Sequence, residues 1–111
     1  MSLHPDELLK EMLSAATGAA KGHAADLKTY IEARTKLIAD GILQLAADRI
    51  APQNPITDDD VKFGFQQIKE SEQTFLLSVK VTLRAAAQDA VNAALSVAAD
   101  AINQAIGIVL L

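Results

Sequence analysis

Large apolar side chains recur in this sequence at steps of three, four or seven residues, which is the spacing of one face of an α-helix. The pattern predicts two long helical arms, over about residues 5–50 and 58–110. No stretch alternates apolar and polar residues for long enough to predict a strand, apart from the short segment 77–83. We therefore expect an all-α protein built on a long antiparallel helical hairpin.

One strong break separates the two arms, at residues 51–57. Pro52 and Pro55 cannot lie inside a helix, because each lacks an N–H group and its ring clashes with the preceding turn. Thr57 is the expected N-cap of the second arm. The three aspartates at 58–60 would then face the positive end of the helix dipole. These features predict a turn between two helices.

A patch of small residues interrupts the first arm at residues 15–25 and contains Gly18 and Gly22. Each glycine costs about 1 kcal/mol relative to alanine inside a helix. The arm is therefore expected either to kink here or to fold back into a third helix. If the chain folds at residues 53–54, this patch faces the alanine-rich residues near 82–92, and small side chains on both sides would allow a close approach.

The tail from Ala85 to the C-terminus carries two charges, Asp89 and Asp100. Such an apolar helix needs a neighbour on most of its circumference, and a second apolar stripe runs through Phe63 and Leu95. We expect the hairpin to assemble into a dimeric four-helix bundle or a larger helical oligomer. The residues predicted to make these contacts are Gly18, Gly22, Ala86, Ala90, Ala94 and Ile102.

Arg34 and Glu72 interrupt the apolar stripes of the two arms, and the hairpin places them opposite each other. One interpretation is a buried ion pair that fixes the register of the helices and the choice of partner. The alternative is that both side chains reach solvent at the edge of the stripe.

Composition excludes several classes of function. The chain has 111 residues, enough for one domain, with a net charge of −4 and no run of basic residues, which argues against nucleic-acid binding. It has no cysteine, and its first residues are acidic where a signal peptide is basic and then apolar. We expect a cytoplasmic protein. Asp100 near the centre of the apolar tail argues against a membrane span.

Candidate chemistry is sparse. His4 and His23 are isolated, and a metal site needs several ligands together. The aspartates at 58–60 lack the glycine and glutamate of a calcium loop and are interpreted as a helix cap. The segment from Gly18 to Gly22 lacks the spacing of a phosphate-binding loop. We therefore expect a non-enzymatic protein without a cofactor.

The leading hypothesis is a helical assembly or interaction module that binds copies of itself or another helical protein. The turn Pro52-Gln53-Asn54-Pro55 between two helices resembles that of needle subunits of type III secretion systems, and this resemblance covers only the turn and its flanks. One alternative is a surface-active protein that binds lipid, a granule or a membrane through its C-terminal helix. Another is a ligand-binding bundle with a pocket near Phe63, Phe65 and Phe75.

Overall fold

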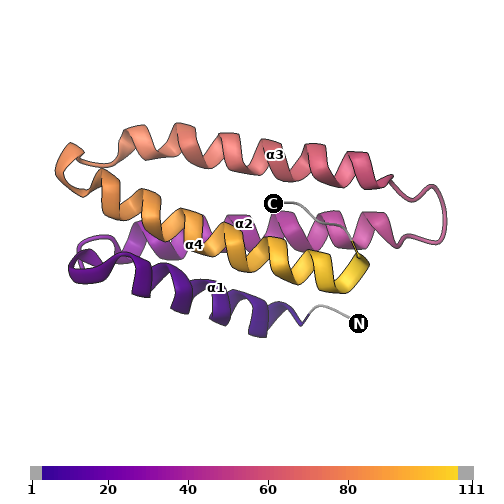
Figure 1. The fold of residues 1–111 in the computed structure, drawn as a ribbon, viewed down its shortest axis with the longest axis horizontal. Helices are drawn as coiled ribbons and strands as arrows, with labels where there is room; N and C mark the ends of the chain where they lie inside the picture. The colour runs from indigo at the N-terminus through magenta and orange to yellow at the C-terminus, as the bar shows by residue number, and fades with distance from the viewer. Residues whose placement is uncertain (1–3, 108–111) are drawn as a thin grey trace.

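The computed structural model describes residues 4–107, and these residues form four α-helices in which each helix runs antiparallel to the one before it (Figure 1). The helices are α1 (Pro5–Ala19), α2 (Lys28–Arg49), α3 (Asp58–Phe75) and α4 (Val81–Ile106). Short 3-10 turns lie at Lys21–His23 and Leu76–Ser78. The expected all-α fold is confirmed, but the four-helix arrangement is formed within one chain.

The first arm folds back between α1 and α2, so of the two sequence alternatives the third helix is the one observed. The break lies close to the two glycines, yet neither Gly18 nor Gly22 has a positive backbone φ angle. Lys21 does, with a φ of 55°. Gly18 and Gly22 are exposed, and a Cβ added to either would have no atom within 4 Å.

The second arm is not continuous, which corrects the prediction of one helix over residues 58–110, of which 108–110 lie outside the described residues. After Phe75 the chain makes a 3-10 turn and an extended step before α4 begins at Val81. Arg84 holds this turn, because its guanidinium donates to the carbonyl oxygens of Leu76, Leu77 and Val79 at 3.1, 3.2 and 3.0 Å. These carbonyls have lost their helical partners, and a cation at a helix C-terminus satisfies them.

The proline turn between α2 and α3 lies where the sequence predicts it. Thr57 caps α3: its hydroxyl accepts from the Asp60 N–H at 3.1 Å, while the Asp60 carboxylate accepts from the Thr57 N–H at 3.0 Å. These hydrogen bonds hold the pKa of Asp60 below its ordinary value. In the loop itself, Asn54 takes a left-handed φ of 51°, which asparagine tolerates better than most residues.

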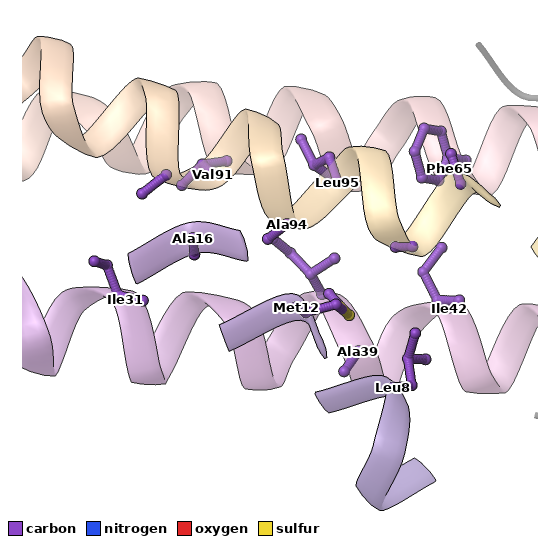
Figure 2. Packing of buried hydrophobic residues seen from close by; sticks show 14 of the residues in the cluster. Leu8, Met12, Ala16, Ile31, Ala39, Ile42, Phe65, Val91, Ala94 and Leu95 are labelled. Carbon is purple, nitrogen blue, oxygen red and sulfur yellow. The ribbon is translucent and has the colours of Figure 1, made fainter. Parts of the chain in front are cut away.

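Helix α1 packs against both α4 and α2, and its contact with α4 is the most extensive in the bundle. We call this region the α1–α4 seam. Its buried alanines are Ala16 and Ala20 on α1, Ala39 and Ala46 on α2, and Ala87, Ala90, Ala94, Ala98 and Ala99 on α4. Figure 2 shows Met12 of α1 lying between Ala94 of α4 and Ala39 of α2, so that one long side chain fills the space that small neighbours leave.

Helix α3 lies along the edge of the bundle that is far from α1 (Figure 1). It packs mainly on α2 and makes few contacts with α4. Val61, Phe65 and Glu72 point into the bundle and are buried. The other side of α3 is open, so the α2–α3 pair has a surface that no helix within residues 4–107 covers.

Candidate functional site

A buried ion pair joins α2 to α3. The Arg34 guanidinium donates from Nε to Glu72 Oε1 at 2.8 Å and from Nη2 to Oε2 at 2.6 Å, which is the two-pronged geometry that arginine forms with a carboxylate. The Arg34 and Glu72 side chains are 11% and 3% exposed. The structure therefore contains the buried pair that the sequence offered as one alternative. Its role in fixing the register stays a prediction.

Phe75 covers this pair on its outer side. The Arg34 Cζ atom lies 3.6 Å from the centre of the Phe75 ring, within the range of a cation–π contact. The hydrogen bond to Glu72 raises the pKa of Arg34, so the guanidinium is charged at every ordinary pH. Phe75 itself remains 45% exposed and presents its outer face to solvent.

Tyr30 lies one helical turn before Arg34 on α2. Its hydroxyl oxygen is buried and makes no hydrogen bond to the residues that the structure describes. Burial raises the pKa of Tyr30, the Glu72 carboxylate raises it further, and Arg34 opposes this rise. Tyr30 thus contributes a neutral ring beside the ion pair.

An apolar groove runs outward from the ion pair between α2 and α3, with a volume of about 520 Å³. We call it the α2–α3 groove. Its floor at one end is Arg34 and Glu72, and its walls are Leu37, Gly41, Gln44 and Leu45 of α2 and Gly64, Gln67, Ile68, Ser71 and Phe75 of α3. From Arg34 to Leu45 the groove follows α2 for about 16 Å, given the 1.5 Å rise per residue. Its length is therefore about three helical turns.

Two glycines shape the floor of the groove. A Cβ added to Gly41 would lie 2.9 Å from Ile68 Cδ1, and one added to Gly64 would lie 2.6 Å from Leu45 Cδ2. Ile68 of α3 therefore lies against Gly41 of α2, and Leu45 of α2 lies against Gly64 of α3. This reciprocal fit brings α2 and α3 close together at these four residues, which also line the hollow of the groove.

The groove carries no unpaired charge. Among its lining residues only Arg34 and Glu72 are charged, and they neutralise each other. Leu37 and Phe75 stand at the rim, 54% and 45% exposed. Exposed apolar residues around a hollow without net charge suit the binding of another apolar side chain, whereas a small-molecule site needs several polar groups converging on the ligand.

The predicted contact residues lie elsewhere in the structure. Ala90, Ala94 and Ile102 are 1%, 0% and 0% exposed and pack inside one chain, so they are not available to a second chain. Ala86 is half-buried, and Gly18 and Gly22 are exposed without close neighbours. These positions were assigned to contacts between chains on the expectation of a long hairpin, whereas the fold-back of the first arm lets α1 cover α4 within one chain.

The remaining candidates are His23 and the aspartates that begin α3. His23 is exposed, with its Nδ1 atom 3.8 Å from a carboxylate oxygen of Asp26. Asp58 pairs with Arg49 at 2.7 Å, consistent with a role in the helix cap. Within residues 4–107, no three histidine or carboxylate side chains lie close enough together to bind one metal ion.

Sequence reasoning missed Leu37, Gly41 and Gly64. A glycine inside a helix is usually a weak point, yet α2 continues through Gly41. A signal was present: Leu37, Gly41 and Gln44 recur at helical spacing and form an uncharged stripe beside the predicted core face.

No family model, no curated protein and no solved structure matches this chain. In the part of the chain that the structure describes, no helix combines the length and the apolar character that a membrane crossing requires. The function of this chain is therefore inferred from the geometry of the α2–α3 groove.

Proposed function

We propose that this protein is a non-enzymatic interaction module that binds an amphipathic helix in the α2–α3 groove. One observation carries the proposal: Leu37 and Phe75 stand exposed on either side of an uncharged apolar hollow, so that two exposed apolar side chains and a recess lie together on one face. Helices that dock in grooves use apolar residues spaced one turn apart, and a groove of about three turns fits two or three such residues.

The alternative of lipid or granule binding through the C-terminal helix receives no support from the position of α4. That helix has eight buried residues, which pack against α1 and α2. An apolar face engaged in this way cannot enter a lipid surface unless the bundle opens.

The test uses backbone amide signals measured by nuclear magnetic resonance. A neutral amphipathic peptide, with leucines one turn apart on one face, is added to the protein at a concentration where sedimentation shows single chains. We expect saturable shifts at the amides of Gly41, Gly64 and Ser71. Gly18 and Gly22, which lie away from the groove, should not respond.

Two controls make this result specific. A peptide of the same composition in scrambled order, without an apolar face, should leave the groove amides unchanged. The variant Leu37→Lys should weaken binding of the amphipathic peptide while keeping the helical circular dichroism of the parent. If the peptide shifts no amide, or shifts Gly18 and Gly22 as much as Gly41, the proposed function is wrong.

A further inference from the structure

We propose that the partner in the α2–α3 groove is a second copy of this chain, bound face to face about a two-fold axis. This inference rests on the proposed function, because it names the occupant of the same groove. Two features of the groove support a second copy. Its lining has no net charge, and the same face carries both protruding side chains and a hollow.

Charge favours this face for self-association. Each chain has a net charge of −4, so two copies repel each other wherever their acidic surfaces meet. The lining of the α2–α3 groove adds nothing to this repulsion, because its single positive and single negative residues form a closed pair. A partner with a strongly basic face would find no unpaired carboxylate in the groove lining to bind.

Shape supports the same partner. A two-fold interface uses one surface twice, so that surface must carry both the protrusions and the hollows. The groove has exposed Leu37 and Phe75 as protrusions, and its hollow, which Leu45 and Ile68 line together with the two glycines, is the place that can receive them.

The spacing of these residues fits an axis that crosses the groove at its middle, perpendicular to the helices. Such an axis exchanges the two ends of α3, so Phe75 of one copy approaches Gly64 of the other. It also exchanges nearby positions of α2, so Leu37 approaches Gly41. Each rim residue of one copy thus faces the hollow of the other copy, and the two α2–α3 pairs form a second layer of four helices.

Sedimentation equilibrium over a range of protein concentration tests this inference. We expect the wild-type chain to move with rising concentration from 11.8 kDa to twice that mass. Leu37→Lys should stay at the mass of one chain, because a buried ammonium would have no carboxylate partner. That change also lowers the net negative charge, so a loss of pairing could not come from greater overall repulsion.

The matched control is Leu77→Lys, which places the same charge on another exposed leucine, at the α3–α4 turn and outside the groove lining. It should pair like the wild type. The inference is overturned if the wild type stays single at every concentration, if Leu37→Lys pairs normally, or if Leu77→Lys loses pairing equally. Peptide shifts at Gly41 and Gly64 in a chain that never pairs would overturn the second copy and keep the proposed function.

Discussion

The α1–α4 seam and the α2–α3 contact join their helices by different means. The seam is lined by alanines and a few long side chains, and its central residues are almost fully buried. The α2–α3 contact uses an ion pair, two glycines and branched side chains, and it leaves Leu37 and Phe75 exposed. The alanines of the seam let the helices meet along their length, whereas α2 and α3 approach closely where the two glycines receive Ile68 and Leu45 and leave a groove beside these contacts.

This difference separates the parts of the molecule that hold the fold from the part that is free to bind. Helix α4 is covered by α1 and α2, so its long apolar face serves the core. Helix α3 is covered on one side, where it buries Val61 and Phe65 and pairs its Glu72 with Arg34 of α2. An interaction surface is expected at such an edge, because binding there does not require the core to open.

The largest effect is expected from breaking the ion pair. Glu72→Ala leaves the Arg34 guanidinium buried without its carboxylate, and removing one partner of a buried pair costs about 3–5 kcal/mol. Urea unfolding followed by circular dichroism measures this change. Glu70→Ala, on the exposed side of the same helix, is the control and should change stability by about 0.5 kcal/mol or less. Equal losses in the two variants would contradict the role of the pair.

Added volume should affect the two contacts differently. Ala90→Leu inserts three carbons into the α1–α4 seam, where Ala90 is 1% exposed, and such overpacking costs about 1–3 kcal/mol. Ser71→Leu adds a similar volume at the open groove and should stay within about 0.5 kcal/mol of the wild type. Asn92→Leu, exposed on the same helix as Ala90, is the control. A neutral Ala90→Leu in thermal melts would show that the seam is not closed.

The cap of α3 should matter less than its ion pair. Thr57→Ala removes the hydroxyl that accepts from the Asp60 N–H, with an expected loss of about 0.5–2 kcal/mol. The pKa of Asp60 is lowered in the folded state, so its contribution is present above the ordinary carboxyl pKa and is lost as the pH falls through the folded value. Thr57→Ala also removes the side-chain hydrogen bond that helps to lower this pKa, so the cost of the change should shrink in acid. A constant cost from neutral to strongly acid pH would argue against the reciprocal cap.

The smallest effects are expected at the glycines, and their order tests how closely α2 and α3 approach. Gly18→Ala meets no atom within 4 Å and should gain up to about 1 kcal/mol of helix stability. Gly64→Ala gains the same helix preference, but its Cβ would lie 2.6 Å from Leu45 Cδ2, so that side chain must move. We expect Gly64→Ala to be less stable than Gly18→Ala in urea unfolding. The reverse order would mean that the α2–α3 contact is looser than described.

The local features of this fold were readable from the sequence. Two prolines and a Thr57 cap define the α2–α3 turn with no help from the rest of the chain. The turn alone predicts that Arg34 and Glu72 face each other, because the helices on its two sides run antiparallel and the two residues lie at similar distances from it. The alanine patches on α1 and α4 also meet, although they do so through Ala16 and Ala20 rather than through the neighbouring glycines.

The non-local features were hidden from sequence reasoning. The break after Phe75 contains neither glycine nor proline, and its stability comes from Arg84, whose guanidinium reaches back to three carbonyls. The one local sign was the short alternation over residues 77–83. The groove could not be predicted from the sequence either, because Gly41 and Gly64 contact Ile68 and Leu45 only when α2 and α3 lie side by side.

Hydrogen exchange of the backbone amides in native protein tests the contrast between the two contacts most directly. The Leu37→Lys variant is the right sample, since pairing of copies cannot then protect α3. We predict that the buried amides of α3, at Val61, Phe65 and Glu72, exchange about tenfold or more faster than those of α4 at Ala90, Ala94 and Ala98. Equal protection of α3 and α4 would contradict the account, because α3 would then belong to the closed core.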